Sequence, residues 1–175
     1  GASVTLGVDY LPHAIRFYRQ ELQFLGGMGI IVLAVAILPM LGIGGMQLYR
    51  TEMPGPIKDS KLTPRITETA KALWYIYLGL TIACIFCYWI AGMTLFDAVG
   101  EAFSTVATGG FTMHDSSFEF YNSPVINLIG IVFMILAATN FSLHFISLQN
   151  FRLGHYWRDL EFRMFIFLLL FGIVI

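Results

Sequence analysis

The stretch STVATGGFTMHD, residues 104–115, places two adjacent glycines among threonines and other small residues. Uncharged runs flank it at residues 72–96 and 120–151, and each is long enough to cross a membrane. Peptide groups that lack a partner are costly in hydrocarbon, because no water is there to bind them. The stretch is therefore either an ordinary external loop or irregular backbone that protein buries inside the membrane.

The composition of the whole chain indicates a helical membrane protein. Of its 175 residues, 57% are hydrophobic and only 12% are charged, whereas about a quarter of a soluble domain is charged. The apolar runs lack the alternation of polar and apolar residues that a transmembrane barrel requires, so helices are the remaining way to satisfy the backbone in lipid. The net charge of −1 gives no reason to expect binding to nucleic acid.

Four uncharged runs set the number of membrane-spanning helices. They cover residues 22–49, 72–96, 120–151 and 164–175, and a helix needs about 20 apolar residues to cross the hydrocarbon. The sequence therefore predicts three spans and the beginning of a fourth. Because the chain begins at Gly1 without methionine and ends inside the last run, we expect an excerpt from a longer protein.

Lysine and arginine gather on one side of this arrangement. They fall in the loop at residues 50–71 and again in residues 152–163. Residues 93–122 contain no lysine or arginine, and apart from one histidine their charged side chains are all acidic. The positive-inside rule places both basic segments in the cytoplasm and the connection that holds the glycines outside. Arg16 and Arg19 fall on the outer side in this scheme, where the membrane interface would accommodate them.

A short helix is predicted to lead into the glycines from outside. Thr94 and Asp97 have the spacing of a capping box, although glutamate or glutamine is the usual third residue, and apolar residues then recur every three or four positions. At about 1.5 Å per residue, a helix over residues 95–106 is roughly 18 Å long, less than the roughly 30 Å of the hydrocarbon core. We therefore expect this segment to stop part-way through the membrane.

Four carbonyl groups become available where the short helix stops, those of Ala107, Thr108, Gly109 and Gly110. The carboxyl end of a helix carries partial negative charge, which favours a cation, and glycine permits conformations that turn successive carbonyls toward one axis. Rings of such carbonyls replace the water shell of an alkali ion in channels. The pattern indicates a pore loop, while an external loop with a surface helix stays open as the alternative.

An internal repeat favours the pore loop. Residues 1–49 and 110–149 both begin with glycine, continue with a short polar loop and a proline near a helix start, and end in an outside-to-inside span. Between the glycines that begin these two segments, Gly1 and Gly110, lie one inward span, one outward span and one half-helix. Span, pore helix, filter loop and span form a potassium-channel-like unit, so Gly1 is expected to close a preceding filter turn.

Two segments resemble a known family. FYRQELQFLGGMGIIVLAVAILPMLGIGGMQLYRTEMPGP, residues 17–56, is similar to the stretch after the first pore loop of bacterial Trk-type (TrkH/TrkG) potassium-uptake membrane subunits. FSTVATGGFTMHDSSF, residues 103–118, resembles the second pore loop of that family. The resemblance covers the whole chain and implies the wider Trk/Ktr/HKT superfamily, in which four non-identical repeats on one chain surround one pore.

The resemblance also implies site residues and partners. Gly110, before Phe111 and after Thr108 and Gly109, takes the place of the second filter glycine, and Gly1 that of the first. The implied function is K⁺ uptake across the bacterial inner membrane, with K⁺ held by backbone carbonyls and no cofactor. Implied partners are lipid, the remaining repeats, a second copy in a homodimer and a cytoplasmic nucleotide-binding regulatory ring. Passive uptake and symport with H⁺ or Na⁺ both stay open.

The predicted organisation has one complete repeat and parts of two others. Its segments are residues 1–49 (end of the first filter loop and inner span of repeat 1), 50–71 (cytoplasmic loop), 72–151 (complete second repeat, with outer span 72–93, pore helix 94–107, filter 107–111 and inner span 123–149) and 152–175 (cytoplasmic link and truncated first span of repeat 3). The predicted fold class is an all-α membrane protein built from span–pore helix–filter loop–span repeats, a fragment of a four-repeat pore.

Polar residues inside and outside the membrane allow two interpretations each. Asn140 and His144 are four residues apart and would share a face of the third span, where they line the inner half of a pore or, as we favour, hydrogen bond between helices. Asp97, Glu101 and Asp115 would concentrate cations at an outer mouth. Ordinary solvated or helix-start charges are the alternative for these acidic residues.

Two other functions are alternatives to a pore. The residue types of a hydrolase triad occur in His114, Asp115, Ser116 and Ser117, but consecutive residues do not normally converge as nucleophile, base and orienting group. Cys84 and Cys87 have the CxxC spacing of redox and metal sites, although nothing nearby completes a metal shell, and small buried side chains are the favoured interpretation. An intramembrane hydrolase and a structural membrane subunit without a pathway thus compete with a pore, which needs no enzyme chemistry.

Overall fold

The structure of the chain is a computed structural model that describes residues 7–32, 62–150 and 154–174. Within these ranges every regular element is a helix and no strand occurs, so the all-α prediction is confirmed. In chain order the elements are η1 (Val8–Tyr10), α1 (His13–Val32), α4 (Leu62–Ile90), α5 (Leu95–Val106), η4 (Ser117–Tyr121), α6 (Pro124–Ala138), α7 (Phe141–Asn150), α8 (Gly154–Arg158) and α9 (Leu160–Val174).

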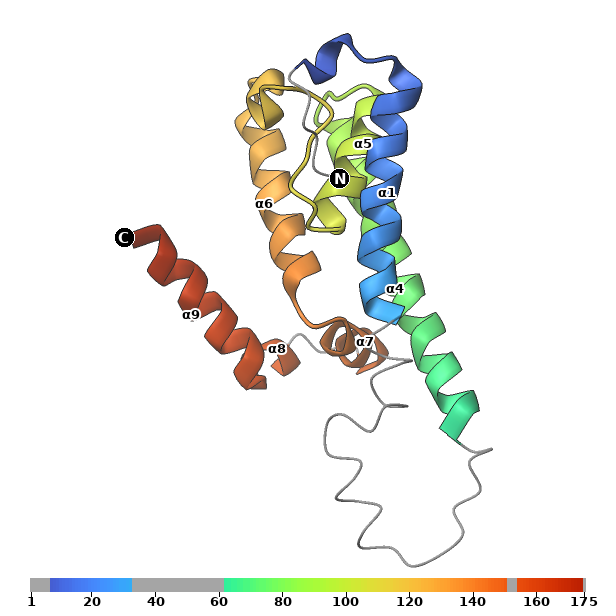
Figure 1. Cartoon of the computed structure of the whole chain (residues 1–175). Helices are drawn as coiled ribbons and strands as arrows, with labels where there is room; N and C mark the ends of the chain where they lie inside the picture. The colour runs from blue at the N-terminus through green and yellow to red at the C-terminus, as the bar shows by residue number, and fades with distance from the viewer. Residues whose placement is uncertain (1–6, 33–61, 151–153, 175) are drawn as a thin grey trace, which may run out of the picture.

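The short helix α5 lies inside a bundle formed with α1, α4 and α6, while α8 and α9 lie to one side (Figure 1). Its buried face carries small residues at four-residue spacing, Ala98, Ala102 and Val106. Small side chains allow close approach between helices in membranes. On the facing helix α4, the hydroxyl of Tyr88 hydrogen bonds with that of Thr105 over 3.0 Å. The helix α5 therefore packs on α4 through this face, whereas Phe96 and Phe103 of the predicted apolar periodicity contact aromatic rings of α1.

The start and the length of α5 are as predicted. The hydroxyl oxygen of Thr94 accepts the Asp97 N–H at 3.1 Å and donates its own hydrogen to the Asp97 carboxylate at 2.7 Å. These bonds satisfy one of the backbone donors that a helix start leaves without a partner. The helix then ends at Val106 after 12 residues, so the capping prediction is confirmed.

The helix α4 begins earlier than the sequence predicts. It has 29 residues and starts at Leu62, inside residues 50–71, which were expected to form a loop. Pro64 falls in the first turn, where a missing backbone N–H costs nothing because no partner exists there. No glycine or proline follows until Gly79, so nothing in the sequence ends the helix at the membrane surface.

One helix in the described ranges is long and apolar enough to cross a membrane. It is the part of α4 from Lys71 to Ile90, with a mean hydropathy of 1.8. α6 and α9 have 15 residues each, and residues 33–49 of the predicted first span lie outside the described residues. In the described part α4 alone meets this criterion of length and composition, and the three complete spans stay a prediction.

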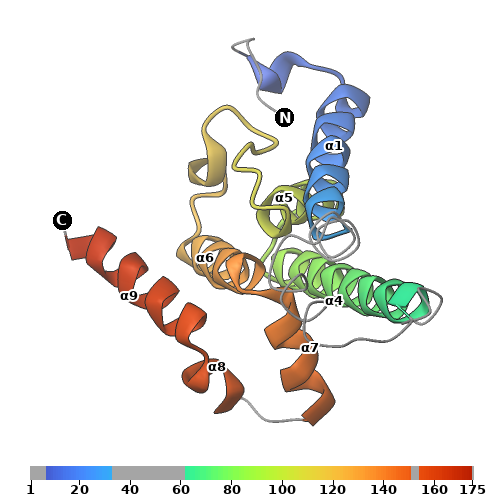
Figure 2. The same ribbon diagram turned by 60° about the horizontal axis from the view of Figure 1, so that its bottom comes forward.

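The predicted inner span at residues 123–149 is interrupted. α6 ends at Ala138, Thr139 is extended with φ −76° and ψ 148°, and α7 starts at Phe141. Figure 2 shows α7 running across the end of α6, as it also does in Figure 1. Threonine and asparagine favour helix ends because their side chains bond to nearby backbone, and the Thr139 hydroxyl donates to the Ile135 carbonyl at 2.8 Å. Apolar composition over a long window does not reveal such a break.

Candidate functional site

The chain reverses direction directly after α5, at the predicted glycine turn. Thr108 N–H donates to the Thr105 carbonyl at 3.2 Å and Gly109 N–H to the Ser104 carbonyl at 2.9 Å, which is the crossed pair of bonds of a Schellman helix end. Glycine usually occupies the left-handed position of this motif, but here it is Thr108, with φ +52°. A β-branched residue in that conformation is strained by about 1–3 kcal/mol, and such strain is concentrated at functional sites.

The same bonds orient carbonyl groups of the turn. The N–H and C=O of a trans peptide point in opposite directions. Because the N–H groups of Thr108 and Gly109 point back into α5, the carbonyls of Ala107 and Thr108 point away from it. The Ala107 carbonyl accepts the Thr108 hydroxyl at 2.7 Å. Between described residues, no hydrogen bond ends on the carbonyl oxygen of Thr108, Gly109 or Gly110.

Gly110 completes the turn and faces open space. Its φ of +77° belongs to the left-handed region, and a Cβ added to it would meet nothing within 4 Å. Conformation, rather than crowding, is therefore what requires glycine at this position. Thr108 and Gly110 are exposed and line a cavity of about 490 Å³ between α5, α6 and α9. The open carbonyls thus belong to the exposed side of the turn.

The helix α1 covers the other side of the turn. Gly27 allows close contact, because a Cβ there would lie 3.0 Å from the Ala107 Cα. The side chain of Gln23 reaches past it: its Nε2 donates to the Phe111 carbonyl at 3.0 Å, and its Oε1 accepts the Phe111 N–H at 3.4 Å. The turn is therefore supported by residues 80 or more positions earlier in the chain.

Glu101 is buried behind the segment that follows the turn. Its side chain has no exposed surface, and its Oε1 accepts the Met113 N–H at 2.8 Å and the Tyr121 hydroxyl at 3.4 Å. Glu101 is therefore not a solvated charge, and its proposed role in concentrating cations at an outer mouth stays a prediction. Burial of a carboxylate is costly unless hydrogen bonds compensate it. Both hydrogen bonds end on Oε1, while Oε2 is buried without a partner among the described residues, and the first of them holds the chain at Met113.

Asp9 and Asp115 join the segment before α1 to the segment that follows the glycine turn. Val8 N–H donates to the Asp115 carboxylate at 2.9 Å, and Asp115 N–H donates to the Asp9 carboxylate at 3.2 Å. His114 Nδ1 lies 2.6 Å from Asp9 Oδ1, and an Arg16 nitrogen lies 3.7 Å from the same oxygen. Partial burial raises the pKa of the Asp9 carboxyl, but the hydrogen bonds from Asp115 and His114 and the charge of Arg16 outweigh it, so that this pKa is lowered.

The geometry around His114 does not support a hydrolase. Its ring is 8% exposed, stacks on Phe120 with 3.5 Å between ring centroids and bonds to Asp9. Among described residues, no hydrogen bond joins the ring to the Ser116 hydroxyl. In the CxxC pair, Cys84 is buried in the core, and the described residues contain no group of three metal-ligating side chains. Cys84 is therefore the small buried side chain that the sequence favoured.

His144 forms the hydrogen bonds between helices that the sequence favoured. It is buried, with Nδ1 2.7 Å from the Tyr156 hydroxyl of α8 and Nε2 2.8 Å from the Leu136 carbonyl of α6. A carbonyl only accepts, so Nε2 carries the hydrogen and Nδ1 accepts from tyrosine. Asn140 directly precedes α7, and its carbonyl accepts the His144 N–H at 3.4 Å, the bond that joins residues one helical turn apart. That either residue lines a pore stays a prediction.

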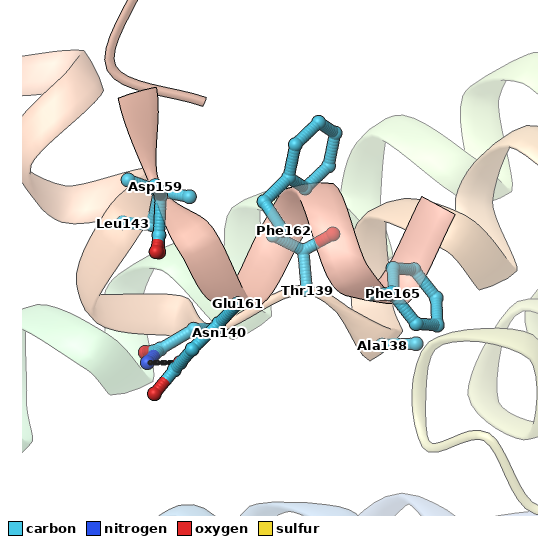
Figure 3. Close-up of a pocket in the computed structure, with 8 residues that line it drawn as sticks. All are labelled: Ala138, Thr139, Asn140, Leu143, Asp159, Glu161, Phe162 and Phe165. Atoms are coloured by element: carbon cyan, nitrogen blue, oxygen red, sulfur yellow. Dashed lines mark hydrogen bonds between the residues drawn. The ribbon is translucent and has the colours of Figure 1, made fainter. Parts of the chain in front are cut away.

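The Asn140 amide turns toward α9 and donates to the Glu161 carboxylate at 3.2 Å (Figure 3). Both residues line a cavity of about 210 Å³ where the break between α6 and α7 meets α9. Its lining residues are Ala138, Thr139, Asn140, Leu143, Asp159, Glu161, Phe162 and Phe165. The break is thus packed against α9 by a polar contact.

Sequence reasoning missed the residues that support the turn from α1. Gln20 and Gln23 are uncharged polar residues, three positions apart at the start of an apolar run, and both are at least nine-tenths buried. That pattern alone signals a polar contact inside the membrane, but not which backbone it binds. Gly1, the predicted counterpart of Gly110, lies outside the described residues.

One family of known proteins matches the whole chain. Its model, described as TrkH, cation transport protein, matches residues 1–175. Among the relatives found, the Trk system potassium uptake protein TrkH of Vibrio parahaemolyticus is 62% identical over 170 residues, which are 96% of this chain and 35% of that protein. TrkG of Escherichia coli K12 is 48% identical over 175 residues, 100% of this chain and 36% of that protein.

A solved structure agrees in fold. The crystal structure of the potassium transporter TrkH from Vibrio parahaemolyticus superimposes with a TM-score of 0.80 at 56% identity, over 95% of this chain and 33% of that chain. The TrkH protein of Escherichia coli K12 is 60% identical over 166 residues, 95% of this chain and 34% of that protein. The chain spans about a third of the length of the relatives that it matches.

Proposed function

The chain belongs to the TrkH family of cation transport proteins, and from that premise we propose that it forms part of a K⁺-selective pore. Members of this family are transporters and not enzymes. The chain supplies one complete span–pore helix–filter–span repeat, residues 72–151, and parts of two more. Four such repeats surround the pore, because one repeat cannot enclose a pathway.

One observation carries the proposal: the turn after α5 leaves its carbonyls open. The carbonyl oxygens of Thr108, Gly109 and Gly110 accept no hydrogen bond from described residues, and the turn lines a cavity. Such backbone is tolerated at membrane depth only where protein buries it or where it lines a water-filled path. With Ala107 and Phe111 at either end, these groups form one of four strands that replace the water shell of K⁺. Gly1 belongs to the strand before it.

The chain lies in a membrane-embedded protein. We propose that this is the bacterial inner membrane, with the glycine turn on the outer side, because the lysines and arginines gather in residues 50–71 and 152–163. A homodimer and a cytoplasmic nucleotide-binding ring complete the uptake system in this proposal. The relatives are named as proteins of a Trk potassium uptake system, which supports such an assembly.

The test compares two glycines that both have a positive φ and both have room for an added side chain. Gly110 and Gly92 have φ values of +77° and +104°, and an added Cβ meets nothing within 4 Å at either. Gly110→Ser and Gly92→Ser are introduced into the full-length protein that contains this chain, and K⁺ and Na⁺ fluxes are measured in liposomes. Ion substitution in the same assay separates passive uptake from symport.

We expect Gly110→Ser to lower the preference for K⁺ over Na⁺ by about tenfold, which corresponds to about 1.4 kcal/mol of relative binding, while Gly92→Ser keeps it. Both substitutions add the same side chain to left-handed backbone, so strain alone cannot produce the difference. A parent protein without any preference for K⁺, or an equal change in both variants, contradicts the proposal.

A further inference from the structure

The segment after the filter glycine is held by a side chain rather than by a neighbouring strand. The Phe111 peptide pairs through both its N–H and its C=O with the carboxamide of Gln23 on α1, at 3.4 and 3.0 Å. An adjacent β-strand would present the same donor and acceptor pair. The described ranges contain no strand, so the glutamine side chain takes over that role.

The orientation of the Gln23 carboxamide is determined by its surroundings. Its Nε2 also donates to the Gln20 Oε1 at 2.6 Å, and its Oε1 also accepts the Ser104 hydroxyl at 3.2 Å. Two donors and two acceptor sites are thus all used. Exchanging the oxygen and nitrogen of this amide would set two donors against each other at the Phe111 N–H, so the bonds admit one orientation.

The position of this amide bears directly on the filter carbonyls. The Phe111 N–H and the Gly110 C=O belong to the same peptide plane and point in opposite directions. A bond from that N–H to Gln23 on the buried side therefore directs the Gly110 carbonyl to the exposed side. The Schellman bonds do the same for Ala107 and Thr108, but they do not reach Gly110.

Glycine at position 109 makes room for the amide. A Cβ at Gly109 would overlap the Gln23 Oε1, so the carboxamide occupies the space of the missing side chain. Gly109 carries no left-handed φ, and its backbone would accept alanine. Crowding against Gln23, rather than backbone conformation, is what requires glycine there.

We infer that Gln23 is a positioning residue for ion selectivity, which holds the Gly110–Phe111 peptide so that the Gly110 carbonyl faces the permeating ion. The inference rests on the proposed function of the turn. It links the inner helix of one repeat to the filter of the next, since Gln23 and Phe111 are 88 residues apart. Loss of the bond frees this peptide plane to rotate, and the ring of carbonyls then loses one member.

The experiment removes the amide group of Gln23 while keeping the length of the side chain. Gln23→Met, Gln23→Glu and the matched control Gln20→Met are introduced into the full-length protein, and K⁺, Rb⁺ and Na⁺ fluxes are measured together with thermal stability. Gln20 is as buried as Gln23 and bonds to it, but no described hydrogen bond joins it to residues 107–113. We expect Gln23→Met to lower the K⁺ over Na⁺ ratio about three- to tenfold, the loss expected for one or two net hydrogen bonds.

The two other variants separate an effect on ion selectivity from an effect on stability. Gln23→Glu keeps an acceptor for the Phe111 N–H, so we expect it to retain more selectivity than Gln23→Met even where a buried carboxylate lowers its stability. Gln20→Met is expected to stay within about twofold of the parent ratio, since it removes at most one bond and none to the turn. Equal loss in Gln20→Met and Gln23→Met, or parental selectivity in an assembled Gln23→Met protein, overturns the inference.

Gly109→Ala decides the question if Gln23→Met does not assemble. The methyl group that Gly109→Ala adds displaces the Gln23 carboxamide, so we expect reduced selectivity. The double variant Gly109→Ala with Gln23→Ala is expected to have the same K⁺ over Na⁺ ratio as Gln23→Ala alone. Independent, additive losses contradict the inference. A parent protein that does not prefer K⁺ refutes the proposed function instead, whereas a selective parent whose Gln23 variants are unchanged refutes only the role of Gln23.

Discussion

The turn after α5 and the break between α6 and α7 both interrupt helical structure in this chain, but they differ in their surroundings. At the turn, Thr108–Gly110 keep their carbonyls free of hydrogen bonds from described residues. At the break, side chains take two of the freed carbonyls: the Thr139 hydroxyl donates to Ile135 at 2.8 Å and His144 Nε2 lies 2.8 Å from the Leu136 oxygen. The carbonyls of Ala137, Ala138 and Thr139 accept no hydrogen bond from described residues. Both segments were predicted to lie within the membrane and both keep carbonyls without such bonds, but Thr108 and Gly110 are exposed, whereas Ala137 and Thr139 are buried.

The difference teaches what polar residues near a break indicate. Polar side chains beside a helix end bind some of the carbonyls that the missing turn would have paired, as Thr139 and His144 do here. At the glycine turn, the supporting side chain Gln23 binds the N–H of Phe111 and thereby leaves the Gly110 carbonyl open. In this interpretation, the exposed carbonyls of the turn are available to an ion, whereas the break, which is buried at Ala137 and Thr139, is structural.

The Gly110→Ser measurement addresses the open turn, and His144→Leu is its counterpart at the break between α6 and α7. Leucine leaves the Leu136 carbonyl and the Tyr156 hydroxyl without the partners that His144 provides. We expect a loss of about 1–3 kcal/mol of stability, the usual effect of stranding buried polar groups, with the K⁺ over Na⁺ ratio unchanged. Thermal unfolding of the full-length protein and the flux assay measure the two effects separately.

The control for this prediction is His144→Gln, which offers both a donor and an acceptor and is expected to lose less stability than leucine. A changed flux ratio at unchanged stability would mean that His144 lines the pathway. That result would support the alternative interpretation, in which the third span lines the inner half of the pore. The break would then not differ from the turn in its access to the ion.

A smaller effect is expected from Thr139→Val. Valine keeps the branched shape and removes only the hydroxyl that donates to Ile135, so we expect a loss of at most about 1 kcal/mol. Ser123→Ala is the matched control, because the Ser123 hydroxyl forms no cap hydrogen bond at the start of α6, and its unfolding midpoint is expected to stay at the parental value. If Thr139→Val destabilises more than His144→Leu, threonine rather than histidine holds the break.

The two interruptions also show how far the sequence alone was informative. The half-helix α5 could be predicted with its bounds and its Thr94 cap, because capping spacing, apolar periodicity and a glycine pair are all local signals. The break at Thr139 was not predicted, since the residues around it are apolar enough to pass for one continuous span. Thr139 and Asn140 are the local signal that a closer inspection would have used.

Contacts between distant segments explain the remaining gap. Gln23 and Phe111 are 88 residues apart, and nothing in either segment specifies the other. The burial of Glu101 was missed for the same reason, because its acceptor role depends on Met113 folding back over α5. In both cases tertiary packing decides whether a polar side chain meets water, protein backbone or an ion.

The most direct test of the open turn is to locate the ion. Crystals of the full-length protein grown in Rb⁺, which replaces K⁺ and scatters anomalously, would be measured at the rubidium absorption edge. We expect an anomalous peak at coordination distance from the carbonyl oxygens of Thr108, Gly109 and Gly110, on an axis shared with three similar turns. A peak elsewhere on the axis, with these oxygens bonded to protein or facing lipid, contradicts the account.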